Sequence, residues 1–400
     1  MSSVRTFTAD QEHSPVSVVW ELTMRCDHAC AHCGSRALKP RPDELGDEDL
    51  LAVADALVEM GTREVALIGG EAYLHPLVFD IVERLASQGV RVAMQTGGRA
   101  LTPELAVRLR DAGMVAVGVS VDGPPKVHDV VRASPGSHRS AIRALHAARD
   151  AGMTTSSNTQ VNTLSLAHLR ETLEHLKPTG IVAWRCQLTA PMGRAADRPD
   201  WILQPWQILE ALDTLAAIQI ELAEEARAEG RSPRQILDVQ LGNNLGYFGP
   251  HETILRSRPG DDARHYQGCQ AGRFVLGIES DGTVKGCPSL PTAPYVGGNV
   301  REMTLEDIWQ TDELAFARED RAEELWGFCG GCMYKEVCKA GCSFTAHTAF
   351  GRRGNFPWCY YRAATLKKQG RRERIVQKER APGKPYDFGL FEIVEEDWVP

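Results

Sequence analysis

The stretch that decides the fold is VSVVWEL (residues 16–22), followed after one residue by MRCDHACAHCGSRA (residues 24–37). The first part is a short apolar run, which is typical of a buried strand. The second places three cysteines, Cys26, Cys30 and Cys33, on one short loop. Three thiols are one too few to close a tetrahedral metal site and one too many for a simple redox pair. The loop therefore predicts a metal centre that keeps one ligand position open.

The composition of the whole chain narrows the class of protein. The 400 residues are 43% hydrophobic and 24% charged, which is typical of a folded globular protein. A net charge of −8 gives no electrostatic case for a nucleic-acid partner, and no apolar run approaches membrane length. Residues 1–16 lack the pattern of a signal peptide, so we expect a cytoplasmic protein. Eleven cysteines in a reducing compartment indicate metal binding or catalysis rather than disulfides.

Strand and helix patterns alternate after the first strand. A helix is expected from Asp47, as its N-cap, to a stop at Gly61. Further strands are expected at residues 64–70, 90–96, 115–122, 156–162 and 181–188. Strands that alternate with helices at this spacing indicate parallel βαβ units. The prediction is an α/β fold, a partial (β/α)6 barrel of TIM type with its active loops at the carboxyl ends of the strands.

Alternation along the later strands separates an apolar face from a polar one. The predicted helix-packing face carries Val115, Val117, Val119 and Val121 on one strand and Val182, Trp184, Cys186 and Leu188 on another. The opposite face carries Ser120, Asp122, Asn158, Gln160, Arg185 and Gln187. A barrel interior is usually filled by large branched side chains, so a small and polar interior indicates a ligand site. Arg185 and Gln187 are expected to contact the substrate, and Cys186 is expected to be an apolar filler.

The spacing Cys26-x3-Cys30-x2-Cys33 after a first strand resembles the signature of the radical S-adenosylmethionine (SAM) superfamily. The resemblance implies a 4Fe–4S cluster whose fourth iron binds S-adenosylmethionine. By the same resemblance, Gly69, Gly70 and Glu71 bind the methionine amino group and His32 touches the adenine. Ser120 and Asp122 are expected at the ribose or carboxylate, with Asn158 and Gln160 as further cofactor contacts. A zinc loop is the alternative to this interpretation.

Seven more cysteines lie in the last third of the chain, at Cys269, Cys287, Cys329, Cys332, Cys338, Cys342 and Cys359. Their order resembles the SPASM extension of radical SAM enzymes, with two zinc sites as the alternative. The resemblance implies two auxiliary 4Fe–4S clusters. The predicted domains are a barrel (1–194), a helical connection (195–262), the cysteine-rich domain (263–364) and a tail (365–400).

The resemblance also implies an interleaved ligand set. Cys329, Cys332, Cys338 and Cys359 would hold a distal cluster, whereas Cys342 would join Cys269 and Cys287 at a proximal one. Fully ligated relatives carry eight thiols here and this chain has seven, so the proximal cluster is expected to have an open or non-cysteine ligand. Asp261, Asp262 and His265 are the nearby candidates for it.

The same resemblance implies modification of a ribosomally made peptide by crosslinking, epimerisation or a related change. A peptide substrate is the expected partner, with a separate leader-binding protein and a flavodoxin or ferredoxin as reductase. Oxidation of a small metabolite is the alternative. Sulfatase maturation is disfavoured because Pro288 stands where that subgroup has a catalytic aspartate. The short segment before the first strand leaves no room for a fused leader-binding domain, and the cationic run 362–380 is either a solvated helix face or a dock for an acidic leader.

Overall fold

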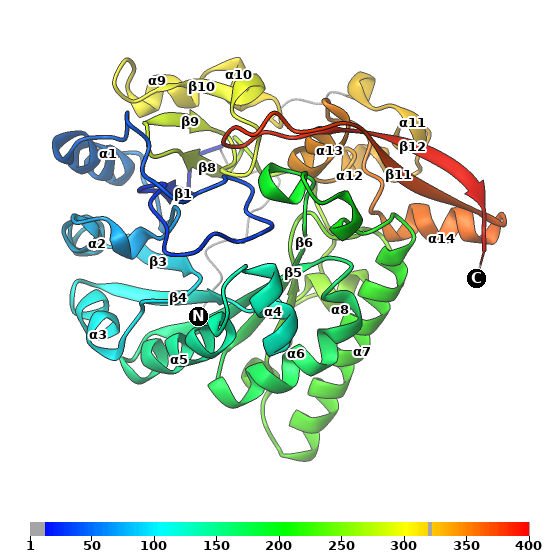
Figure 1. The fold of residues 1–400 in the computed structure, drawn as a ribbon, viewed down its shortest axis with the longest axis horizontal. Coiled ribbons are helices and arrows are strands. Elements are labelled where there is room, and N and C mark those ends of the chain that lie inside the picture. Colours follow the sequence, from blue (N-terminus) through cyan, green and yellow to red (C-terminus); the bar gives the residue numbers. More distant parts are fainter. Residues whose placement is uncertain (1–12, 319–321, 400) are drawn as a thin grey trace.

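The computed structural model describes residues 13–318 and 322–399, so the segment 1–12, examined above for a signal peptide, lies outside the described residues. One sheet of ten strands forms the centre of this described part (Figure 1). Its order is β10 (Val296–Asn299), β9 (Thr283–Lys285), β8 (Val275–Ile278), β1 (Ser17–Glu21), β2 (Glu64–Ile68), β3 (Arg91–Thr96), β4 (Met114–Ser120), β5 (Thr154–Val161), β6 (Ala183–Leu188) and β7 (Asp238–Leu241).

The strands from β8 through β1 to β7 are all parallel, whereas β9 and β10 pair antiparallel at one edge. Strands β10 and β7 are the two ends of the order, so the barrel stays open. This confirms the predicted α/β fold with a partial barrel. Strand β7 comes from the predicted connection and β8 from the predicted cysteine-rich domain, so the sheet runs across the limits proposed at residues 194 and 262, which stay predictions.

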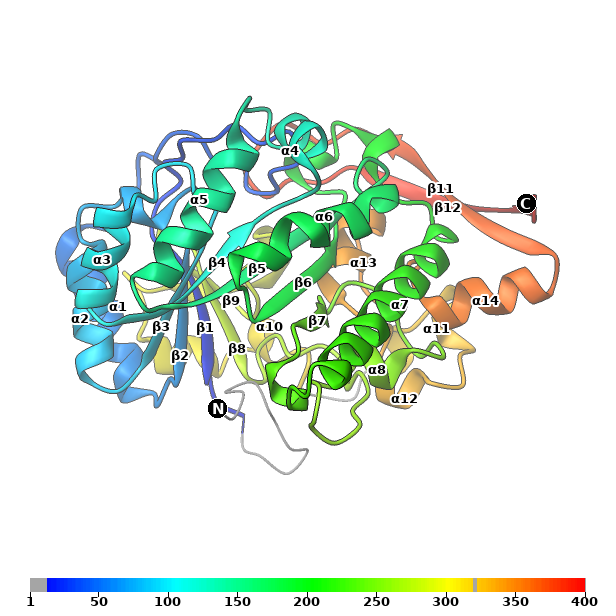
Figure 2. The same cartoon turned by 90° about the horizontal axis from the view of Figure 1, so that it is seen from below.

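Helices cover the outer face of the curved sheet (Figures 1 and 2). They are α1 (Asp47–Glu59), α2 (Val78–Ser87), α3 (Pro103–Asp111), α5 (Ser137–Asp150), α6 (Leu169–Leu176) and α7 (Gln207–Ala228). The short helix α4 (Pro125–Val131) lies instead at the carboxyl end of the strands, where it packs against α5 and its Val131 carbonyl accepts from the Ala31 amide. The predicted cap of the first helix is wrong by one residue: Gly46 is the N-cap, and Asp47 opens the helix instead. Across the described residues, no helix combines the length and the apolar character that crossing a membrane requires.

The predicted alternation of faces is present in the strands that line the barrel. In β3, β5 and β6, buried positions alternate with partly exposed ones. Trp184 and Cys186 are fully buried, as expected for the helix-packing face. Two valines were assigned wrongly to that face. Val115 is 37% exposed because the β3–β4 register shifts beside it, and Val182 is 50% exposed because it precedes β6.

The last third of the chain packs beside the barrel through short helices. They are α8 (Glu252–Arg256), α9 (Leu305–Trp309), α10 (Asp312–Ala315), α11 (Gly327–Gly330), α12 (Lys335–Cys338), α13 (Ser343–Phe350) and α14 (Tyr360–Lys368). A two-stranded ribbon of β11 (Arg371–Glu379) and β12 (Leu390–Asp397) follows, and the loop between its strands runs back over the barrel (Figure 1).

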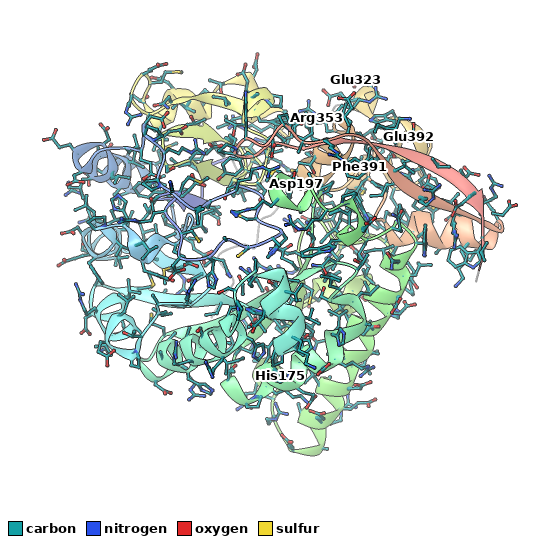
Figure 3. The ribbon with its side chains drawn as sticks, viewed as in Figure 1. His175, Asp197, Glu323, Arg353, Phe391 and Glu392 are labelled. Atoms are coloured by element: carbon teal, nitrogen blue, oxygen red, sulfur yellow. The ribbon has the colours of Figure 1, made fainter. Side chains whose placement is uncertain are left out.

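The cationic run 362–380 is not one helix, since α14 ends at Lys368 and β11 begins at Arg371. Its charged side chains face acidic partners on β12, among them Arg372 with Glu396 at 2.8 Å and Lys378 with Glu392 at 3.1 Å. Glu392 is labelled on β12 in Figure 3. Because the ribbon neutralises its own cations, the structure argues against this run as a dock for an acidic leader.

Candidate functional site

The three-cysteine loop leaves the carboxyl end of β1, the end at which the barrel strands deliver their loops. Cys30 is buried, and Cys26 and Cys33 are partly buried. The amide of His28 donates to the Cys26 Sγ at 3.4 Å, and the amide of Cys33 donates to the Cys30 carbonyl at 3.3 Å. Burial, and then the Glu71 carboxylate, raise the pKa of Cys26 to about 12. A thiolate at this position therefore requires a bound cation, which suits a metal cluster.

Two glycines at the end of β2 allow that strand to pass against the cysteine loop. The amide of Gly70 donates to the Thr23 carbonyl at 2.7 Å. A Cβ on Gly69 would lie 2.4 Å from that carbonyl, and one on Gly70 would lie 2.2 Å from the Arg25 carbonyl. Both contacts are too close for any side chain. These glycines therefore fit the strand end to the cysteine loop itself, a reason that the sequence did not indicate.

Glu71 is buried directly beside the first thiol. Its carboxylate lies within 4.8 Å of the Cys26 Sγ, and it accepts hydrogen bonds from two neutral groups, the Thr96 hydroxyl and the Gly97 amide at 2.7 Å. Burial raises the pKa of Glu71 to about 8, although the two hydrogen bonds act in the opposite direction. A buried carboxyl group that receives such neutral donors gains most from a cationic ligand. An ammonium group fits this place.

Asp122 and Arg132 form a buried ion pair beneath the cysteine loop, with the Arg132 Nε 2.6 Å from the Asp122 carboxylate. The same guanidinium reaches the Cys30 Sγ at 3.7 Å. The backbone amide of Gln160 donates to the Asp122 carboxylate at 2.9 Å. Burial opposes ionisation of Asp122, but the charge of Arg132 brings its pKa down to about 2. Asp122 thus holds the arginine that supports Cys30, and a direct contact of Asp122 with a cofactor stays a prediction.

His32 lies against the same ion pair. Its Nε2 is 3.9 Å from the Asp122 carboxylate and its Nδ1 is 3.2 Å from the Val131 carbonyl. Burial lowers the pKa of His32 to about 4, so the ring is neutral at physiological pH. A neutral ring at the third thiol suits stacking on a base, and that role also stays a prediction.

Side-chain amides line the barrel interior toward the carboxyl ends of the strands. Gln95 donates to the Ser120 hydroxyl at 3.1 Å, and Arg185 donates to Gln240 at 3.1 Å. The register places Asn158 between Ser120 and Arg185, and Gln160 beside Gln187. All of these side chains are partly exposed, as expected for a face that lines an open space. The predicted polar residues therefore share one face.

Four of the later thiols surround one pocket. Cys329, Cys332, Cys338 and Cys359 line it together with aromatic side chains that include Phe328, Tyr334 and Phe356. Burial raises the pKa of Cys359 to about 12, and the thiols of Cys329 and Cys332 add to that shift. This grouping matches the distal set that the resemblance implied.

Three other thiols form a second group. Burial raises the pKa of Cys342 to about 12, and the thiols of Cys269 and Cys287 add to that shift. The proposed fourth ligands Asp261, Asp262 and His265 are all exposed. The residue of that segment that turns inward is Tyr266, which is buried and carries a hydroxyl without a hydrogen-bond partner among the described residues. Cys186 is fully buried on β6 within the hydrophobic core, as expected for an apolar filler.

Some of these residues were missed by sequence reasoning. Gln95 follows Ala93 on the interior face of β3, so the alternation used for the other strands was sufficient to find it. Arg132 and Tyr266 lie on a helix terminus and an irregular segment, where no period marks an inward side chain. Only the tertiary structure brings them to the thiols.

Known proteins resemble the chain in the same two regions. A model of the radical SAM superfamily matches residues 20–179, and one of an iron–sulfur cluster-binding domain, SPASM, matches residues 269–333. An AdoMet-dependent heme synthase of Methanosarcina barkeri is 30% identical over 353 residues, 88% of this chain and 97% of the relative. The chain belongs to the radical SAM superfamily. It is a radical SAM enzyme with a SPASM domain.

Other relatives of this radical SAM enzyme carry different functions. The mycofactocin maturase MftC of Mycolicibacterium smegmatis is 28% identical over 381 residues, 93% of this chain and 87% of the relative. The solved structure of anSMEcpe with bound AdoMet and the Kp18Cys peptide has a TM-score of 0.65 at 18% identity, and the match covers 87% of this chain and 94% of that one. The latter likeness supports the fold alone.

The residues present fit the cofactors typical of the superfamily, S-adenosylmethionine and 4Fe–4S clusters. Three thiols lie on the first loop, where burial raises the pKa of Cys26 to about 12, and a buried carboxyl group suited to an ammonium lies beside Cys26. The two later thiol groups are separate from this loop in sequence and lie on short helices and turns of the SPASM region.

Proposed function

We propose that Cys26, Cys30 and Cys33 hold a 4Fe–4S cluster that binds S-adenosylmethionine, and that two auxiliary clusters occupy the later thiol groups. Bound in this way, the cofactors supply a 5′-deoxyadenosyl radical that takes a hydrogen atom from an unactivated C–H bond. The chain supplies positions and charge. Glu71 receives the methionine ammonium, and Arg132 holds Cys30 through a charged hydrogen bond.

We propose a peptide as the substrate, and the chemistry of the barrel interior carries this part of the proposal. The partly exposed interior positions toward the carboxyl strand ends carry mainly amides, together with one hydroxyl and one guanidinium. These residues are Gln95, Ser120, Asn158, Gln160, Arg185, Gln187 and Gln240. Amide side chains both donate and accept hydrogen bonds, as peptide groups do. A peptide backbone therefore finds complementary partners along this face, with Gln240 on the edge strand β7 and Arg185 and Gln187 on the neighbouring strand β6.

A small-molecule substrate is the second candidate, because the relative of Methanosarcina barkeri is named a heme synthase and is matched over nearly its full length. Heme and related tetrapyrroles carry several carboxylates, and each carboxylate requires a cationic or hydrogen-bond-donating partner. The interior offers Arg185 for one of them. The lining described above therefore favours the peptide over a polyanionic ring.

The cluster assignment is tested by reconstitution without oxygen. Three clusters predict about twelve irons per chain. Replacing Cys26, Cys30 and Cys33 by alanine is expected to remove one third of the iron and all cleavage of S-adenosylmethionine. Iron near four per chain, or tightly bound zinc in the later sites, would contradict the auxiliary pair.

The substrate assignment is tested by co-expression with a short peptide encoded beside this gene, followed by mass spectrometry of the peptide. A mass change that depends on Cys26 supports the peptide. Arg185→Gln and Gln187→Leu are expected to lower the yield while S-adenosylmethionine cleavage without substrate is retained. Gln235→Leu, at an exposed residue in the short turn Pro233–Gln235, serves as the control. Turnover of a tetrapyrrole in place of the peptide would select the second candidate.

A further inference from the structure

One residue, Tyr247, contacts ligand residues of both later thiol groups, the proximal one through its hydroxyl and the distal one through its backbone carbonyl. The amide of Cys342, in the proximal group, donates to the Tyr247 hydroxyl at 2.9 Å. The thiol of Cys359, in the distal group, lies 3.6 Å from the Tyr247 carbonyl. The Tyr247 ring also lines the pocket that the four distal thiols surround. Tyr247 thus spans the region between the two groups.

The ring of Tyr247 sits in a fully packed environment. It is 1% exposed, lies 4.3 Å from the Tyr266 ring and 5.0 Å from the Phe356 ring, and has the Arg256 guanidinium 5.5 Å from its centroid. Burial raises the pKa of Tyr266, and the thiols of Cys269 and Cys342 in the proximal group and of Cys338 in the distal group add to that shift, so Tyr266 lies near both groups. Packed aromatic side chains rather than solvent therefore fill the space beside the two thiol groups.

The backbone between the groups is shaped to fit this ring. Lys339, Ala340 and Gly341 join Cys338 to Cys342, and all have positive φ angles of 48°, 59° and 69°. Consecutive left-handed residues are uncommon, above all where two of them carry side chains. A Cβ on Gly341 would lie 2.3 Å from the Tyr247 ring. The linker turns its two cysteines to different groups while it packs flat against Tyr247.

We propose that Tyr247 couples the two auxiliary sites, as the residue through which one electron passes from the proximal to the distal cluster. With one cluster held by Cys269, Cys287 and Cys342 and another by Cys329, Cys332, Cys338 and Cys359, one electron lost by the first would be gained by the second, and a one-electron carrier of the flavodoxin or ferredoxin class would then remove it. Electron tunnelling is faster through packed, hydrogen-bonded matter than across a gap. This inference rests on the proposed function, because it requires clusters in both thiol groups.

The test uses the reconstituted full chain and measures electron redistribution directly. Irradiation of the frozen, oxidised protein adds electrons to the clusters at a temperature at which they cannot exchange. Stepwise warming then lets them move, and electron paramagnetic resonance follows the proximal and distal signals. The variants are Tyr247→Leu, which removes the ring, and Tyr247→Phe, which removes the hydroxyl. Phe356→Leu removes a neighbouring ring that lines the distal pocket and serves as the matched control.

Tyr247→Leu is expected to slow redistribution at least tenfold, whereas Tyr247→Phe retains the rate within about twofold and alters the proximal signal alone, because Cys342 loses its acceptor. Equal rates in Tyr247→Leu and Phe356→Leu would overturn the bridge. If Tyr247→Leu loses iron, Tyr247→Phe becomes the deciding variant. An unchanged proximal signal in Tyr247→Phe would contradict the hydrogen bond from the Cys342 amide to the Tyr247 hydroxyl, and with it the bridge. Failure of the proposed function is seen separately, as iron that never reaches the later sites in the unaltered chain.

Discussion

Replacing Arg132 by methionine removes the cation of the buried ion pair beneath the cysteine loop. The methionine side chain still fills most of the volume of the arginine. Arg132 is 9% exposed, and Asp122, its partner at 2.6 Å, is fully buried. The substitution leaves the Asp122 carboxylate without its cation. It also removes the donor that reaches the Cys30 Sγ. The structure therefore predicts effects on both stability and the radical cluster.

The size of the effect follows from the burial of the pair. Two charges about 4 Å apart interact by about 4 kcal/mol at an effective dielectric constant of about 20. Breaking a buried pair at one partner typically costs about 3–5 kcal/mol, because an uncompensated charge stays buried. Asp122→Asn together with Arg132→Met leaves no such charge. The double variant is expected to recover a large part of the loss.

Anaerobic urea unfolding of the reconstituted protein measures these differences, with iron content followed in the same samples. Arg170→Met is the matched control, since Arg170 makes a two-fold contact with Glu221 at 2.6 and 3.0 Å on the surface. Both partners there are more than half exposed, so about 0.2–1 kcal/mol is expected. If Arg132→Met cost no more than Arg170→Met, the structural role assigned to the buried pair would be wrong.

Three further predictions concern the same region. Gly70→Ala is expected to lower the iron of the radical site, because the new Cβ meets the Arg25 carbonyl, whereas Gly46→Ala, whose new Cβ meets only the Asp49 carboxylate at 3.9 Å, leaves iron content unchanged. Glu71→Gln is expected to weaken S-adenosylmethionine binding by equilibrium dialysis while the iron is retained, and loss of iron would contradict the assigned role. Burial lowers the pKa of His128 to about 3, so the unfolded chain binds its proton first, and stability is lost as the pH falls from about 6.5 toward 3. His128→Asn keeps an acceptor for the Asp122 amide and is expected to reduce that loss in unfolding measurements made across the window.

The central barrel was predictable because its signals are local and periodic. Each predicted strand from 16–22 to 181–188 overlaps an observed one, and the alternation of faces holds through β3, β5 and β6. Strands β7 and β8 were missed because four-residue strands carry too little pattern, and their places in the sheet depend on pairing with β6 and β1. The ribbon of β11 and β12 was missed for a related reason: its charges obscure the alternation, and its pairing is between charged side chains.

At the site, the thiols were predictable because their spacing carries chemistry, whereas their supports were not. Asp122 was expected to face a cofactor, which stays a prediction, but no pattern indicated that its carboxylate also binds Arg132 and the backbone amide of Gln160. That outcome depends on where α4 ends relative to the cysteine loop, which no local pattern encodes. Tyr247 is in the same position, since its contacts join segments about a hundred residues apart.

The loop between β11 and β12 contacts parts of the protein that are far from it in the sequence. Asp387 pairs with Arg36 of the cysteine loop at 2.7 Å, and the Tyr386 hydroxyl donates to Glu21 at the end of β1. The Lys285 ammonium of β9 lies 4.3 Å from the centroid of the Tyr386 ring and is itself fully buried. Arg36 also binds Asp197, labelled after β6 in Figure 3. One short segment thus contacts the cysteine loop, the barrel and the SPASM region at once. The separation between the radical site and the proximal thiols is therefore set by the C-terminal segment as well as by the sheet.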